Sequence, residues 1–155
     1  MKVVRDRVLE DARVLVAGGA HGLMIENFGD SPFHPGRVPA VVVSHMTALA
    51  VAVRQAFPNT PLGVNVLRND GASALAVAHA AGAGFIRVNV LCGARVTDQG
   101  LIQGIAHDLM RERAALGAEQ IKVLADVDVK HSAALAARDI TDETADLVHR
   151  GMADA

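Results

Sequence analysis

The chain has 155 residues, of which 51% are hydrophobic and 21% are charged, and its formal net charge at pH 7 is −2. This composition is typical of one globular domain, residues 1–155, and excludes a disordered chain. The nearly neutral charge and the 3% of aromatic residues exclude a general nucleic-acid-binding protein, because such proteins need a basic surface or aromatic platforms for the bases.

Helical and strand-like segments alternate along the chain. Apolar residues at helical spacing predict five helices, and short apolar runs, most of them preceded by a Gly-Ala pair, predict the strands between them. Helices often end at a residue in the left-handed backbone conformation, which glycine adopts readily. This explains the position of glycine before each apolar run. In chain order the expected elements are a helix 5–17, a strand from 22, a helix 38–57, a strand from 62, a helix 70–81, a strand from 85, a helix 98–116, a strand from 121, a helix 139–150 and the first residues of a strand near 153.

This alternation predicts parallel strands joined by right-handed crossovers. The strands recur about every 33 residues, and eight such units need about 250 residues, the usual size of a (β/α)8 barrel. We therefore predict an α/β fold: an incomplete (β/α)8 TIM-barrel-like fold with about four parallel strands and outer helices. A small open doubly wound sheet is the alternative. Because a four-stranded sheet has two unpaired edges, we also expect a homo-oligomer.

The N-terminus and the cysteine content indicate a cytoplasmic location. The charged residues Lys2, Arg5 and Asp6 stand where a signal peptide needs an apolar stretch. The uncharged segment 71–86 is too short and too rich in Ala and Gly to span a bilayer. The single cysteine, Cys92, excludes an intramolecular disulfide and a cysteine-based zinc site, and it favours a reducing compartment. We expect no transmembrane segment, whereas association with a membrane surface stays open.

Five motifs occur in order with the spacing of barrel strands. They are Ile25–Phe33, Pro61–Asp70, Phe85–Val90, Val96–Gly100 and Ala125–His131. Together they resemble the BtpA/SgcQ family, whose fold is TIM-barrel-like and normally longer at both ends. The resemblance covers nearly the whole chain. It implies that the first strand and the last few strands of the barrel are missing here, with the phosphate-binding loops that many barrels place after strands seven and eight.

The resemblance implies two functions of different classes. One branch of the family is associated with biogenesis or stabilisation of photosystem I, which implies a non-catalytic assembly factor. The other branch carries a nucleosidase label, which implies an enzyme acting on a nucleoside or a phosphosugar. Cleavage of an N-glycosidic bond passes through an oxocarbenium-like state and needs a carboxylate to stabilise charge or activate water. No cofactor is expected for either function.

Side-chain alternation gives each expected strand one apolar face and one face that ends in a polar residue. The polar residues that end the inward face are Glu26, Asn65, Asn89 and Asp126. Parallel strands bring such residues to one side and one end of the sheet, which is the C-terminal mouth where barrel enzymes work. For an enzyme, Glu26 and Asp126 are the candidate catalytic carboxylates, and Asn65 and Asn89 are candidates to bind ligand hydroxyls.

The same polar groups have an alternative interpretation. They satisfy one another, with Arg87 and Lys122 pairing the two carboxylates in a buried network. A metal site built from Glu26, Asp126 and His131 is a further option, but no pair of these ligands has helical i, i+4 spacing, and we predict no metal.

Two further segments carry candidate ligand or catalytic groups. Arg68 and Asp70 precede the helix 70–81, where Asp70 suits the N-cap and the pair is a candidate anion-binding site; the alternative is a capped turn with a solvated arginine. Lys130 and His131 follow Asp126, and this cluster suits general acid and base chemistry, with Lys130 alternatively binding a phosphate. Asp98 is expected to be a plain N-cap of the helix 98–116.

The segment 28–36 is long for a loop between a strand and a helix. It contains Phe28 and Phe33 together with two prolines. We interpret it either as a lid over the mouth or as a partner-binding loop.

Overall fold

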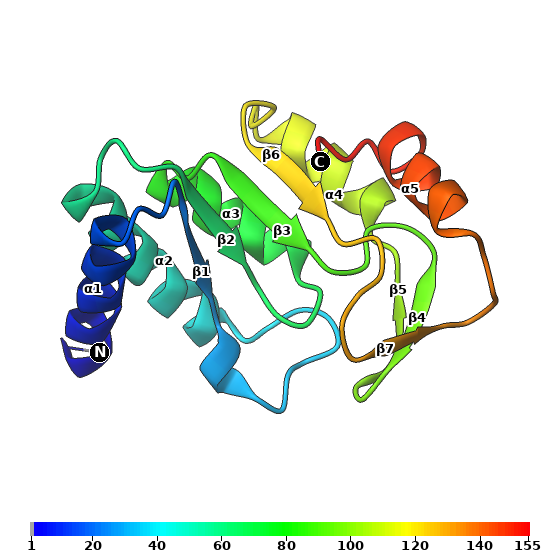
Figure 1. Cartoon of the computed structure of the whole chain (residues 1–155), viewed down its shortest axis with the longest axis horizontal. Coiled ribbons are helices and arrows are strands. Elements are labelled where there is room, and N and C mark those ends of the chain that lie inside the picture. Colours follow the sequence, from blue (N-terminus) through cyan, green and yellow to red (C-terminus); the bar gives the residue numbers. More distant parts are fainter. Residues whose placement is uncertain (1) are drawn as a thin grey trace.

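The computed structural model describes residues 2–155 and contains a parallel sheet, a small antiparallel sheet and five α-helices within that range (Figure 1). The helices are α1 (Lys2–Ala17), α2 (Ala40–Ala56), α3 (Gly71–Ala81), α4 (Ala106–Ala115) and α5 (Ile140–His149). The strands are β1 (Leu23–Glu26), β2 (Leu62–Asn65), β3 (Phe85–Val88), β4 (Ala94–Thr97), β5 (Gly100–Gln103), β6 (Lys122–Ala125) and β7 (Ser132–Ala134), and a short 3-10 helix η1 spans Phe28–Asp30.

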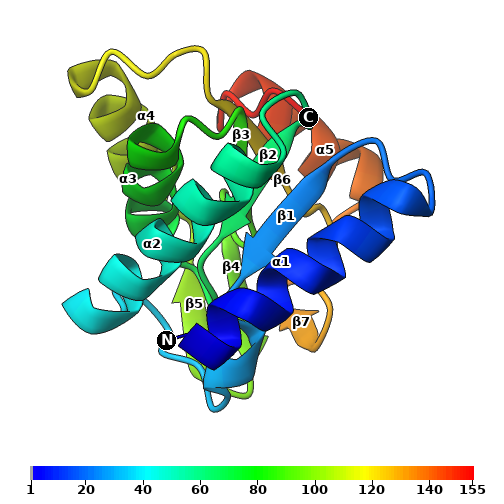
Figure 2. The same cartoon turned by 90° about the vertical axis from the view of Figure 1, so that its left-hand side faces the viewer.

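The main sheet has the strand order β1-β2-β3-β6, and every neighbouring pair is parallel. The order in space therefore follows the order in the chain, whereas a doubly wound sheet reverses direction at a switch point. Helices α2, α3 and α4 lie together on one side of this sheet (Figure 2). Sequential parallel strands with outer helices are the arrangement of a partial TIM-barrel-like fold, which confirms the predicted fold class.

The core lies between the sheet and these helices. The helix-facing strand residues Val64, Ile86 and Val123 are completely buried, as are Ala50 of α2 and Leu75 of α3. Burying each large aliphatic side chain contributes about 1.5–3 kcal/mol to folding. Among residues 2–155, none of the helices combines the length and the apolar character needed to cross a membrane.

The expected start of a strand near residue 153 lies along β6. The Asp154 N–H donates to the Val123 carbonyl at 2.9 Å, and the Ala125 N–H donates to the Ala155 carbonyl at 2.8 Å. These two bonds flank the end of β6 as bonds from a parallel neighbour do. The last residues therefore run alongside β6, although they form no strand of the sheet.

The predicted helix 98–116 is wrong over residues 98–105. Residues 94–103 form the antiparallel hairpin of β4 and β5, and α4 begins only at Ala106. Apolar and polar residues alternate in 94–97, and Gly100 adopts a φ of +95°, which a tight turn requires. Asp98 therefore lies in the hairpin turn and caps no helix. Strand β7, which the sequence did not indicate, pairs with β4 and completes the second sheet.

Candidate functional site

The polar residues that end the parallel strands meet on one side and at one end of the sheet. Asn65 donates to Oε1 of Glu26 at 3.1 Å, and Asn89 donates to Oδ2 of Asp126 at 2.7 Å. Arg87 connects the two pairs. The predicted convergence of these four residues is confirmed, because strand parity and parallel pairing act on all four in the same way.

Arg87 is the centre of this network. Its Nε and Nη2 atoms donate to the two carboxylate oxygens of Asp126, both at 2.9 Å, and its Nη1 donates to Glu26 at 3.3 Å. The hydrogen bond to Asp126 raises the pKa of Arg87; burial opposes this rise, and the negative charges of Asp126 and Glu26 add to it. One cation thus lies between two carboxylates, as the alternative interpretation expects. Lys122 is not part of the network, because it lies at the opposite end of β6 and pairs with Asp154.

Above the network lies a cavity of about 570 Å³, which we call the mouth cavity. Six of the eight predicted site residues line it: Glu26, Arg68, Asn89, Asp126, Lys130 and His131. The structure therefore brings both predicted catalytic carboxylates into one cavity with both candidate residues of the segment after β6.

The other two predicted site residues lie outside the mouth cavity. Asn65 is 1% exposed and contacts Glu26 through the hydrogen bond that its amide donates. Asp70 is buried, and its carboxylate accepts from the N–H groups of Ser73 at 3.0 Å and Val38 at 2.8 Å. The first bond is the predicted N-cap of α3, and the second fixes the start of the segment that leads into α2.

Glu26 has one carboxylate oxygen that the protein leaves open. Its Oε1 atom accepts from Asn65 and Arg87, whereas no donor within residues 2–155 reaches Oε2. Both oxygens of Asp126 are occupied by Arg87 and Asn89. Of the two carboxylates, Glu26 is therefore the one with an oxygen available to a ligand or a water molecule.

The loop between β6 and β7, which carries Lys130 and His131, is held by two arginines. Arg68 donates to the Lys130 carbonyl from one side. Arg95 donates to Asp128 and to the Val127 carbonyl, both at 2.8 Å. Our sequence analysis missed Arg95, because a lone arginine in a strand carries no signal of a long-range contact. The two anchors place the loop at the rim of the mouth cavity.

The segment 28–36 and the β4–β5 hairpin contribute the remaining wall of the mouth cavity. Phe28 and Phe33 line it, and their ring centroids lie 6.2 Å apart. Asp98 reaches it from the hairpin turn. This position is the one that a lid would occupy.

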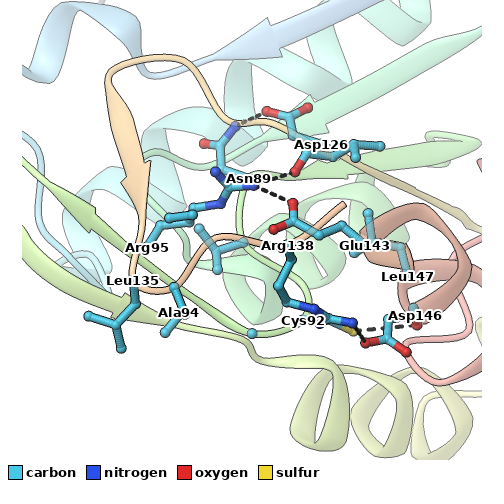
Figure 3. A pocket seen from close by; sticks show the side chains of 15 residues that line it. Asn89, Cys92, Ala94, Arg95, Asp126, Leu135, Arg138, Glu143, Asp146 and Leu147 are labelled. Carbon is cyan, nitrogen blue, oxygen red and sulfur yellow. Dashed lines mark hydrogen bonds and ion pairs between the residues drawn. The ribbon is translucent and has the colours of Figure 1, made fainter. Parts of the chain in front are cut away.

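A second, smaller cavity of about 170 Å³ lies on the other side of Asn89 and Asp126 (Figure 3). Its charged groups pair with one another: Arg95 binds Glu143 at 2.6 Å, and Arg138 binds Asp146 at 2.8 Å. Burial raises the pKa of the Cys92 thiol at its wall, and the nearby charge of Asp146 adds to the rise. The thiol is therefore protonated at neutral pH and is a poor nucleophile.

No cluster of three or more His, Cys, Asp or Glu side chains within residues 2–155 is arranged to hold a metal ion. Glu26, Asp126 and His131 line the same cavity but do not form such a cluster.

Comparison with known proteins relates these residues to a family. The model of the BtpA family matches residues 1–155. The photosystem I biogenesis protein BtpA of Synechocystis sp. is 48% identical over 99% of this chain and 53% of its own length. An uncharacterised protein of Thermococcus kodakarensis is 48% identical over 98% of this chain and 56% of its own length. A Caenorhabditis elegans protein, named as uncharacterised and mitochondrial, is 32% identical over 91% of this chain and 52% of its own length.

No solved structure matches this chain at a significant level. The chain spans about half the length of the curated relatives it matches. Within that half, the family model extends over every residue, and the motifs that indicated the resemblance are the segments that form the sheet and the mouth cavity. The chain belongs to the BtpA family.

Proposed function

We propose that the mouth cavity binds a nucleoside or a phosphosugar and that Glu26 acts on the sugar as the catalytic carboxylate. The observation that carries this proposal is the free Oε2 atom of Glu26 in a cavity of about 570 Å³ at the C-terminal end of parallel strands. This end is where barrel enzymes place their chemistry.

The hydrogen-bond network gives the two carboxylates different proposed roles. Hydrolysis of an N-glycosidic bond needs a base that takes a proton from the attacking water while the bond to the leaving nitrogen breaks. Glu26 takes that proton at Oε2, and the leaving nitrogen keeps the bonding electron pair and receives a proton from His131 or Lys130. Asp126 holds Arg87 and Asn89 in place through its three hydrogen bonds.

The test is a turnover assay of the purified chain with a panel of nucleosides and sugar phosphates, with products separated by chromatography. Glu26→Gln keeps the shape of the side chain and an acceptor for Arg87, and it is expected to lower the rate at least about a hundredfold, because loss of a general base costs that much. Asp126→Asn is expected to lower the rate as well, because Arg87 loses one of its two charged partners. Glu119→Gln is the control, since Glu119 is exposed outside the mouth cavity. A Glu26→Gln variant with the wild-type rate would contradict the proposal.

A second candidate is a role in photosystem I biogenesis. It is favoured by the 48% identity with the Synechocystis protein of that name. The exposed ring of Phe28 beside the mouth offers a contact for a partner protein. The archaeal and nematode relatives come from organisms that do not photosynthesise, so this role does not account for the whole family.

This candidate has its own test. A Synechocystis strain that lacks its relative is supplied with this chain, and photosystem I content is measured. Recovery of photosystem I is expected if the role is shared. If content stays low although the chain accumulates, this candidate is wrong.

A further inference from the structure

Arg68 is a buried cation without a carboxylate partner among residues 2–155. Its side chain lines the mouth cavity, the residue is 7% exposed, and its only acceptor in this range is the Lys130 carbonyl. Its Nε atom is buried and has no hydrogen-bond partner. Buried arginines are usually paired, because an uncompensated charge inside a protein is costly. Arg95, which is 9% exposed, shows the usual arrangement, with the carboxylates of Asp128 and Glu143 on one guanidinium.

A second cation lies beside Arg68. Lys130 lines the same cavity, and its own carbonyl accepts the hydrogen bond from Arg68, so the two residues are neighbours in space although 62 positions separate them. Lys130 is exposed and forms no ion pair within residues 2–155. The remaining carboxylate on the wall, Asp98, accepts from Gln99 in the hairpin turn. Arg68 and Lys130 therefore have no ion-pair partner within residues 2–155, whereas Arg87 is shared by two carboxylates, so the part of the cavity around Arg87 carries one net negative charge.

Asn89, which lines both the mouth cavity and the smaller cavity, has an unused acceptor. Asn89 is 4% exposed, its amide nitrogen donates to Asp126, and its Oδ1 atom is buried with no partner. An amide oxygen in this state accepts from a ligand hydroxyl or N–H group. The cavity thus provides donors for an anion at Arg68 and Lys130 and an acceptor for a hydroxyl at Asn89.

From these three residues we infer that the ligand of the mouth cavity is a phosphorylated sugar, with its phosphate between Arg68 and Lys130 and a sugar hydroxyl at Asn89. The inference rests on the proposed function and narrows its substrate class. The planar guanidinium of Arg68 suits a phosphate, whose oxygens accept several charge-assisted hydrogen bonds. This position, after β2 and β6, differs from the loops after strands seven and eight that bind phosphate in many barrels.

The experiment measures binding to the full chain by calorimetry and by NMR of the arginine Nε–H signals, with inorganic phosphate, ribose 5-phosphate and ribose as probes. Arg68→Gln is expected to weaken phosphate binding about ten- to a hundredfold, the usual effect of losing a charged hydrogen bond. Lys130→Gln is expected to weaken it about two- to fivefold, because Lys130 is exposed to solvent. Lys130→Gln also leaves the packing unchanged, so it tests the site even if Arg68→Gln does not fold. Arg5→Gln removes one exposed positive charge on α1, away from the cavity, and is expected to bind phosphate as the wild type does.

The possible outcomes separate this inference from the proposed function. The inference is overturned if phosphate does not bind at millimolar concentration, if Lys130→Gln binds it as tightly as the wild type, or if ribose binds as tightly as ribose 5-phosphate. If phosphate and ribose 5-phosphate bind as expected but nothing in the panel is turned over, the phosphate site stands and the catalytic role of Glu26 fails. If an unphosphorylated nucleoside is turned over without any phosphate binding, the proposed function stands and the inference fails.

Discussion

At the scale of single residues, Arg87 determines what the two carboxylates of the mouth can do. It occupies both oxygens of Asp126 together with Asn89, but it contacts Glu26 through one oxygen only. The interpretation of the polar strand ends as a mutual network is therefore confirmed for Arg87 and its two carboxylates, and this network still leaves one carboxylate oxygen of Glu26 open. The proposed function of Glu26 depends on that asymmetry.

A second carboxylate, Asp154, holds the C-terminal residues on β6. It accepts from the Val123 N–H at 2.9 Å and from Lys122 and Arg113, both at 3.0 Å. Burial alone would raise the pKa of Asp154, but the hydrogen bonds from Val123 and Lys122 and the charges of Arg113 and Lys122 outweigh it and lower the pKa. Because the folded-state pKa lies below the unfolded value of about 3.9, this carboxylate stabilises the fold above that pH, and the stabilisation is lost as pH falls through the folded-state pKa.

Asp154→Asn is therefore expected to lower the free energy of unfolding at pH 7 by about 1–2 kcal/mol, because it removes the charged partner of Arg113 and Lys122. The difference from the wild type should shrink as pH falls below about 4, where protonation removes the same charge from the wild type. Urea denaturation at pH 7 and at pH 3 measures both values. Asp6→Asn in the exposed part of α1 is the control, with an expected change within about 0.5 kcal/mol. A deficit of equal size at both pH values would show that the charge of Asp154 is not what stabilises this segment.

At the scale of elements, the β4–β5 hairpin is the feature that shapes the mouth beyond the parallel sheet. It is inserted between β3 and α4, and Gly104 joins its end to α4. The Gly104 N–H donates to the Gly93 carbonyl at 2.7 Å, which closes the base of the hairpin. A Cβ atom on Gly104 would lie 2.7 Å from the Leu91 carbonyl oxygen and 2.8 Å from the Cys92 carbonyl carbon. Because both neighbours are backbone atoms, they cannot give way by rotating a side chain.

Gly104→Ala is accordingly expected to destabilise the protein by about 1–3 kcal/mol, the usual cost of overpacking. Gly84→Ala is the matched control: no atom lies within 4 Å of its Cβ position, and alanine there is expected to be neutral or slightly stabilising. Thermal denaturation of both variants compares them directly. Equal melting temperatures for the two variants would mean that the base of the hairpin is looser than the structure shows.

At the scale of the whole molecule, the β1 side of the sheet presents an open edge suited to association. Strand β1 pairs only with β2, so its other edge carries unpaired backbone groups. Helix α1, which precedes β1, exposes Val3 at 82% and Val14 at 61%. These two valines are three helical turns apart and therefore lie on the same face. Arg7 and Glu10 lie between the two valines on this face, so the face is mixed and not apolar. The open edge of β1 beside it is what favours association, and we expect a second copy of the chain to cover it.

Light scattering is expected to give a mass of about twice the 16.2 kDa of one chain or a higher multiple. Replacing Val3 and Val14 together by glutamate should shift the protein to the monomer, because two carboxylates would have to be buried in the interface. Val41→Glu changes a valine of α2 that is 56% exposed and should leave the mass unchanged. A wild-type protein that is monodisperse at 16.2 kDa contradicts this prediction.

Local patterns in the sequence determined the positions of four of the five helices, the four parallel strands and the four polar strand ends. Periodicity and side-chain alternation act over a few residues, and parallel pairing then carries Glu26, Asn65, Asn89 and Asp126 to one place without further information. The N-cap at Asp70 was predictable for the same reason, since its partner Ser73 is three residues away.

Only the tertiary structure decided which partners these residues take. Lys122 and Arg87 were equally good partners for the carboxylates by their face of the strand, but Lys122 lies at the far end of β6 and binds Asp154. The hairpin was missed because its two short strands have too few residues to outweigh the helical pattern that follows them. The burial of Arg68 and its contact with Lys130 depend on two loops that are 62 residues apart in the chain. Such contacts arise from packing between distant segments, for which the local sequence holds no periodic signal.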